Sequence, residues 1–115
     1  MKKFNSITLN KVLKNGGLTL NNKGITAEFK AGYQVSIKDC YILELNNTDE
    51  IIKAINQLIK KACKGYFIGL WIDNNKIYID YSINIRSKKL ALKIASVKNQ
   101  LSIFSWYNQD CIYTS

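Results

Sequence analysis

Two carboxylates and two aromatic rings stand close together in the stretch YFIGLWIDNNKIYIDY, residues 66–81. Asp73 and Asp80 could act as an acid/base pair, and Trp71 and Tyr78 could hold a ligand beside them. In a hairpin with a two-residue turn, however, Asp73 and Asp80 lie at opposite ends of one face, too far apart for joint acid/base catalysis at one bond. Other acidic residues are scattered along the chain and fix no third carboxylate nearby: Glu28, Asp39, Glu44 and Asp110.

The chain contains no histidine, so it lacks the commonest general base and the commonest metal ligand. The serine and threonine hydroxyls therefore have no base partner, and the six glycines form no phosphate-binding loop. Cys40, Cys63 and Cys111 show no C-x-x-C spacing, and we expect reduced, buried thiols. A contact between Cys40 and Cys111 is the alternative, because DCYI and DCIY repeat each other. We predict that the protein is not an enzyme and uses no metal and no cofactor.

The net charge of +9 suggests a nucleic-acid surface. Arg86 is the only arginine among 17 basic residues, although arginine is the residue that reads guanine or phosphate with a bidentate fork. The chain is also rich in Ile, Asn and Lys, whose codons are AT-rich, so genome composition is another source of the lysines. If nucleic acid is bound, we expect contacts on the outer helix faces: Lys53, Lys60, Lys64, Lys89 and Lys93.

With 115 residues and 47% hydrophobic composition, the chain is expected to form a single globular domain, residues 1–115. Residues 1–16 should form a short helix or arm, and residues 17–115 a core of sheet and helices. No apolar run approaches the length of a membrane span, and the start resembles no signal peptide. We therefore expect a cytoplasmic protein without a membrane partner, either a monomer or a homodimer.

Hydrophobic periodicity and turn residues predict an α+β fold. Its sheet should be mainly antiparallel, with five to seven short strands and two main helices packed on one face. We expect a first short helix at residues 8–14, capped by Thr8, and main helices beginning at Asn47 and after Ser87. Strands are expected at residues 17–21, 33–37, 40–45, 101–106 and 111–114, in addition to the hairpin of residues 66–81. Residues 25–30 form a strand or an extended loop, and residues 82–87 lead into the second main helix.

The hairpin is the best-defined part of the prediction. A two-residue turn at Asn74 and Asn75 pairs Trp71 with Tyr78 and leaves a gap at Gly69, opposite Asp80. One face is then a core face, with Ile68, Leu70, Ile72, Ile77, Ile79 and Tyr81. The other is mixed and carries the candidate partner-binding residues Phe67, Trp71, Asp73, Tyr78 and Asp80. An aromatic pair that merely stabilises an exposed sheet is the simpler interpretation.

Several segments together resemble a family of small proteins from phages and other mobile elements. They are GGLTLN (16–21), GYQVSI (32–37), FIGLWIDNNKIYIDYSINI (67–85), ALKIA (91–95) and NQLSIFSW (99–106). The family shows a Gly-Gly start, a G-Y-x-V-S strand, a W-x-D-x-G-x-x-Y-x-D-x-S hairpin and a closing N-Q-x-x-I-x-D segment. This chain departs from it at Asn75, where glycine is usual, and at Ser105, where aspartate is common. The resemblance covers residues 16–113.

The family carries no established catalytic activity, so the resemblance implies a genomic setting rather than a mechanism. Small accessory proteins of mobile elements often disable host defences by binding a nuclease or its guide complex. The leading hypothesis is therefore a non-enzymatic, anti-CRISPR-like inhibitor that binds a host defence nuclease or ribonucleoprotein in a bacterial cytoplasm. A nucleic-acid-binding accessory protein is the alternative, and a small-molecule or nucleotide binder at the gap between Gly69 and Asp80 is a third.

Overall fold

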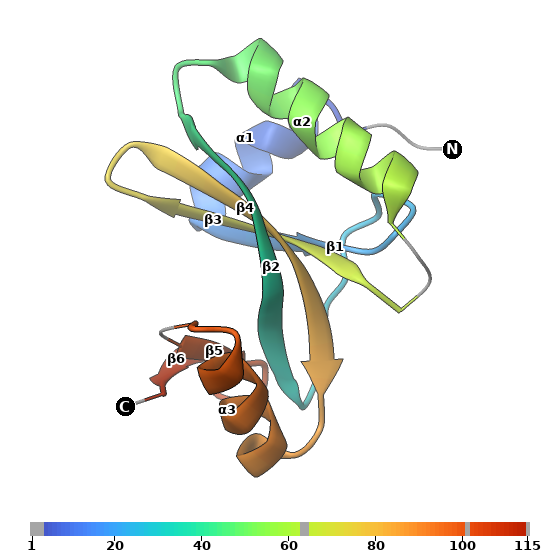
Figure 1. Cartoon of the computed structure of the whole chain (residues 1–115). Coiled ribbons are helices and arrows are strands. Elements are labelled where there is room, and N and C mark those ends of the chain that lie inside the picture. The colour runs from blue at the N-terminus through green and yellow to red at the C-terminus, as the bar shows by residue number, and fades with distance from the viewer. Residues whose placement is uncertain (1–3, 63–64, 101, 115) are drawn as a thin grey trace.

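A computed structural model of the chain describes residues 4–62, 65–100 and 102–114 and shows an α+β fold, as predicted (Figure 1). Within these residues, three helices are each followed by two strands. The helices are α1 (Ser6–Asn15), α2 (Thr48–Lys61) and α3 (Lys88–Val97). The strands are β1 (Gly17–Leu20), β2 (Tyr33–Glu44), β3 (Phe67–Asp73), β4 (Lys76–Ile85), β5 (Ser102–Ser105) and β6 (Asp110–Tyr113).

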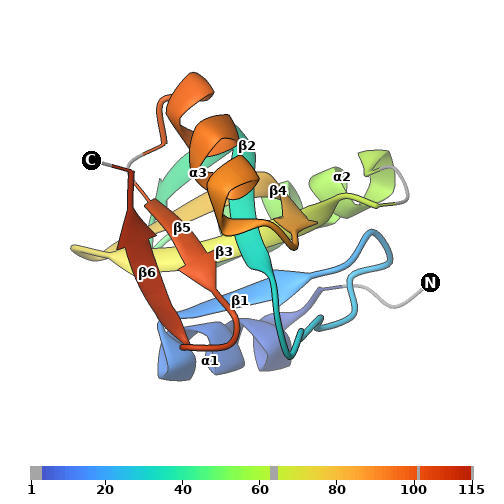
Figure 2. The ribbon, with the colours of Figure 1, turned by 90° about the horizontal axis from the view of Figure 1, so that it is seen from below.

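The six strands form one antiparallel sheet in the order β1-β3-β4-β2-β5-β6. The sheet curls strongly, so that β5 and β6 turn away from the plane of β3 (Figure 2). The long central strands β2 and β4 extend through both ends of the sheet and therefore follow its curl. The predicted strand number of five to seven is confirmed.

The helices cover one face of the sheet, as predicted. In β4, Ile77 and Ile79 join the core cluster of α1 and α2, while Ile83 and Ile85 join the cluster of α3. These four side chains alternate with others along the strand and therefore point to the same side. Consequently α2 and α3 lie on one face but at opposite ends of β4 (Figure 1).

The segments at 33–37 and 40–45, expected as two strands around a turn at Lys38 and Asp39, form the single strand β2. That prediction was wrong because the polar pair marks β-bulges rather than a turn. The register against β4 shifts between Ser36 and Lys38 and again between Asp39 and Tyr41. A bulge bends a strand without ending it, so β2 follows the curl of the sheet. Residues 82–85, expected to lead from the hairpin into the next helix, extend β4.

The starts of the three helices test the predicted caps. Asn5, not Thr8, caps α1, because its side chain accepts a hydrogen bond from the Thr8 backbone N–H at 3.1 Å. Asn47 begins α2 without a side-chain capping bond, whereas the Ser87 hydroxyl caps α3 as predicted by accepting from the Leu90 N–H at 3.2 Å. Residues 25–30 are an extended loop with one isolated bridge to β1, through Thr26.

Candidate functional site

The hairpin of β3 and β4 has the predicted register. Trp71 pairs with Tyr78, Gly69 pairs with Asp80, and the turn residues Asn74 and Asn75 have φ angles of 51° and 63°. Positive φ at both central residues is the geometry of the two-residue turn that matches strand twist. The predicted core face is confirmed at its centre, where the side chains are buried: Ile68, Leu70, Ile77 and Ile79.

The opposite face of the hairpin carries a half-exposed tryptophan. Trp71 retains 49% exposure, and its neighbour Tyr78 on β4 pairs in turn with Ile42 of β2, which is 58% exposed. Gly17 of β1 pairs with Trp71, and a Cβ atom at Gly17 would lie 3.3 Å from the indole ring. Because Gly17 has no side chain, the indole ring of Trp71 has space beside β1. We call Ile42, Trp71 and Tyr78 the open-face patch.

Phe67 and Asp73, the other candidates on this face, lie outside the open-face patch. Phe67 is half-buried and packs edge-to-face against Phe29 at a centroid distance of 5.3 Å. Phe29 contacts Trp106 in the same way at 5.4 Å, so Phe67 belongs to an internal aromatic cluster. Asp73 is exposed and pairs with Lys76 beside the turn.

The gap expected beside Asp80 is occupied by Asp80 itself. A Cβ atom at Gly69 would collide with the Asp80 carboxylate, and the Gly69 backbone N–H donates a hydrogen bond to it. The glycine therefore makes room for a neighbouring side chain and not for a ligand. This corrects the hypothesis of a small-molecule or nucleotide site at that position.

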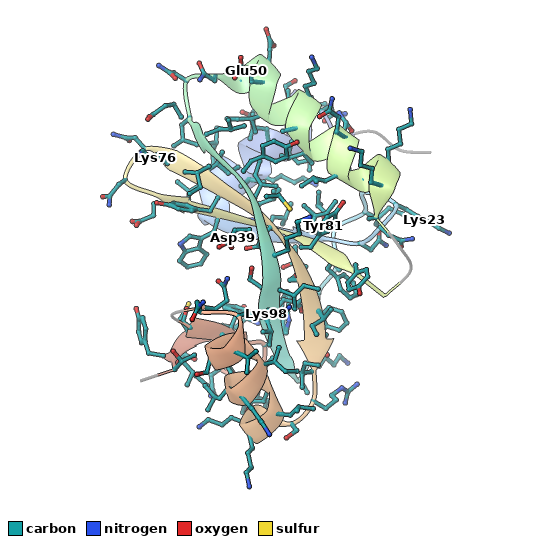
Figure 3. The ribbon with its side chains drawn as sticks, in the orientation of Figure 1. Lys23, Asp39, Glu50, Lys76, Tyr81 and Lys98 are labelled. Carbon is teal, nitrogen blue, oxygen red and sulfur yellow. The ribbon has the colours of Figure 1, made fainter. Side chains whose placement is uncertain are left out.

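Asp39 and Asp80 form a carboxylate pair that the sequence did not indicate. They are direct neighbours across β2 and β4, and Ser36 contacts both carboxylates. The Gln100 side chain, just beyond α3, donates to both Asp39 oxygens at 3.4 Å. Figure 3 labels Asp39 near the middle of β2, between the ends covered by α2 and α3. The polar pair Asn99-Gln100 thus provides a contact within the chain.

The environment of Asp80 raises its pKa to about 7, well above its ordinary value. Burial of the carboxylate is the largest cause, and the negative charge of Asp39 adds to it. Hydrogen bonds from Ser36 and from the Gly69 N–H act in the opposite direction because they favour the charged form. Asp80 therefore holds a proton over a pH range in which an exposed aspartate is ionised.

A buried polar network centred on Gln34 of β2 supports the end of the sheet that lies near α3. The Gln34 amide donates to the Ser82 hydroxyl at 2.9 Å, and its oxygen accepts from the Trp106 indole N–H at 3.0 Å. Asn84 donates to the same oxygen at 3.4 Å. Every side-chain N and O atom that is buried in the described residues has a hydrogen-bond partner. Sequence analysis did not single out Gln34, since a lone glutamine in an alternating strand usually faces water.

The candidate nucleic-acid residues do not gather on one surface. Lys53 and Lys60 are exposed on α2, while Lys89 and Lys93 are exposed on α3 at the other end of β4 (Figure 1). Lys64 lies outside the described residues. The basic side chains thus form two separate groups, one for each helix.

Cys40 and Cys111 are free thiols, both half-buried, and Cys63 lies outside the described residues. Burial raises the pKa of the Cys40 thiol, which keeps it protonated and weakly nucleophilic. Within the described parts of the chain, no three His, Cys, Asp or Glu residues gather as metal ligands would. None of the helices described there has the length and apolar character needed to cross a membrane.

Comparison of the chain with family models, with curated proteins and with solved structures finds no match.

Proposed function

We propose that this protein is a non-enzymatic binding protein whose main contact surface is the open-face patch of Ile42, Trp71 and Tyr78. The observation that carries the proposal is the exposure of Trp71 and Ile42 on either side of Tyr78, on one face of the sheet. Tryptophan and tyrosine dominate the energetic centres of protein interfaces. Rigid strands hold the three side chains in place, so little ordering accompanies binding.

The proposed partner is a host defence nuclease or its guide complex, and the protein acts as an anti-CRISPR-like inhibitor in the cytoplasm of a bacterial host. The resemblance to small mobile-element proteins motivates this choice of partner. The exposed Asp73 flanks the open-face patch, and Asp39 adds a carboxylate beside Asp80, whose own group is protonated below its pKa of about 7. A nuclease surface that binds nucleic acid is rich in basic side chains, which such acidic groups complement.

The substitution Trp71→Ala should reduce capture of the partner by at least about tenfold. A tryptophan at the centre of an interface typically contributes about 2 kcal/mol or more to the binding free energy. The test is a pull-down from lysate of bacteria that express a CRISPR–Cas nuclease, with captured proteins identified by mass spectrometry. Tyr107→Ala is the matched control, since Tyr107 is an exposed aromatic residue outside the open-face patch. Equal capture by the wild type and Trp71→Ala would exclude the open-face patch. Failure of all three proteins to enrich a nuclease would contradict the proposed function.

A nucleic-acid-binding accessory protein is the second candidate, supported by the net charge of +9 and by the exposed lysines of α2 and α3. Phosphate binding by lysines predicts that affinity falls steeply with salt, by about a hundredfold or more between 50 and 200 mM. An electrophoretic shift assay with DNA and RNA over that range measures it. Absence of a shift at the lowest salt would rule out this function.

A further inference from the structure

Among the described strands, only β5 pairs with the outer edge of β2, and only over a short part of its length. β4 pairs with β2 from Tyr33 to Glu44, but on the other side β5 pairs only with Tyr33 and Gln34. The two bulges lie before Tyr41, so the stretch from Tyr41 to Glu44 has a regular register and no second neighbour among the described strands. An unpaired strand edge presents backbone donors and acceptors to which another strand can add.

A groove lies between β2 and α2. Its volume is about 610 Å³, and its β2 wall consists of five consecutive residues, 37–41. Two bulges interrupt the alternation of side chains in this stretch, so neighbouring residues can line the groove together. The opposite wall comes from the last turn of α2, from two residues that follow it and from β4: Leu58, Lys61, Ala62, Tyr66 and Tyr81.

A second hollow of about 200 Å³ continues the groove toward the start of α2. Tyr41 lines both hollows, and the second one lies between β2 and Glu50, Lys53, Ala54 and Gln57. Figure 3 shows Glu50 at the start of α2 and Tyr81 toward its other end. The Tyr81 hydroxyl donates to the Leu58 carbonyl at 3.0 Å and anchors the helix over β4. A single face of α2 therefore lines the groove throughout.

The dimensions and charges of the groove fit one kind of occupant. From Glu50 to Lys61 the helix advances about 16 Å, and five residues of an extended chain span about 17 Å. Three lysines line the groove, Lys38, Lys53 and Lys61, against two carboxylates, Asp39 and Glu50. The rim therefore carries one more positive than negative side chain.

We propose that an extended, acidic peptide segment of a partner protein adds to the outer edge of β2 as a further strand and lies in the groove against α2. Backbone hydrogen bonds to the regular stretch of β2 supply orientation, as in other cases of strand addition. Apolar side chains of the segment enter the groove over Tyr41, Leu58 and Tyr81, and acidic side chains pair with the lysine rim. Of the open-face patch, only Ile42 belongs to this stretch of β2, whereas Trp71 and Tyr78 lie on β3 and β4.

The test uses the peptide Ac-EEVTVEE-NH2 and the full-length, 15N-labelled protein at low salt. We expect amide shifts to concentrate in residues 38–44 and on the groove face of α2. The basic peptide Ac-KKVTVKK-NH2 should bind more weakly, and Ac-EEVPVEE-NH2 should not add as a strand, because proline lacks the backbone N–H. Lys61→Glu should weaken binding of the acidic peptide about fivefold or more, through the loss of an exposed ion pair.

Lys60→Glu is the matched control, because it makes the same charge change at the adjacent position outside the groove. Equal weakening by both substitutions would show unspecific attraction to a basic protein and would overturn the proposal. So would shifts spread over the whole surface, equal binding of the proline peptide, or no shifts at all. Sedimentation of the free protein at the same concentration completes the test, since a dimer formed through β2 that the peptide does not displace also contradicts it.

Discussion

The substitution Asp80→Asn should raise the free energy of unfolding at pH 8 and leave it nearly unchanged at pH 4. In the wild type, the buried carboxylate of Asp80 must carry a charge beside Asp39 once the pH exceeds its raised pKa of about 7. Asparagine is neutral at every pH and keeps an oxygen that can accept from the Gly69 N–H. It can also donate to Asp39, which turns a repulsive contact into a hydrogen bond.

The sign follows from proton binding in the two states. Asp80 binds its proton with a pKa of about 7 in the folded protein and near its ordinary value of 3.8 in the unfolded chain. Between these values the folded state holds the additional proton, so the contribution of Asp80 to stability is greatest below pH 4 and falls as the pH rises to about 7. Three pKa units correspond to at most about 4 kcal/mol, and the residual exposure of Asp80 makes the true difference smaller.

Urea unfolding at intervals from pH 4 to pH 8 measures this difference for the wild type and for Asp80→Asn. Asp73→Asn is the matched control, since Asp73 is exposed beside the turn of the same hairpin. Its stability profile should run parallel to that of the wild type. The prediction is contradicted if the profile of Asp80→Asn is also parallel, because the carboxylate of Asp80 would then titrate alike in both states.

The hairpin could be predicted residue by residue because its register depends on a two-residue turn and on alternation within 16 residues. The pairing of Asp39 with Asp80 could not, since it depends on β2 lying beside β4 and on two bulges that shift the register. Polar residues such as Lys38 and Asp39 occur both in turns and in bulges, so their residue types alone do not distinguish the two. Local sequence therefore located the open face but not the carboxylate pair on it.

The helix faces show a related limit. The apolar residues of α3 recur at helical spacing and include Leu90 and Val97, yet these two side chains are 48% and 72% exposed. Ala91 and Ala95 are the buried residues of α3, because small side chains let the helix lie close to Val35 and Ile103 of the sheet. Apolar residues beside a narrow contact remain at the surface, since periodicity gives a direction but not the width of the buried stripe.

Gln34→Ala should lower the free energy of unfolding by about 2–4 kcal/mol, although glutamine is a polar residue in a half-open sheet. The substitution removes a side chain that is only 8% exposed and leaves the Ser82 hydroxyl and the Trp106 indole N–H without their partner. Gln57→Ala is the control, because Gln57 is exposed on α2 and its loss should change stability by no more than about 0.5 kcal/mol.

A double-mutant cycle separates the hydrogen bond from the packing. Trp106→Phe removes the indole donor while keeping an aromatic ring for the contacts with Phe29 and Phe104. Gln34→Ala destabilises the protein partly because it leaves the buried Trp106 N–H without a hydrogen-bond partner. Trp106→Phe removes that N–H, so the double variant should lose less free energy of unfolding than the sum of the two single variants. We expect the difference to be about 1–2 kcal/mol. Strict additivity, measured by urea unfolding at pH 7, would show that Gln34 stabilises the fold by filling space and not through this bond.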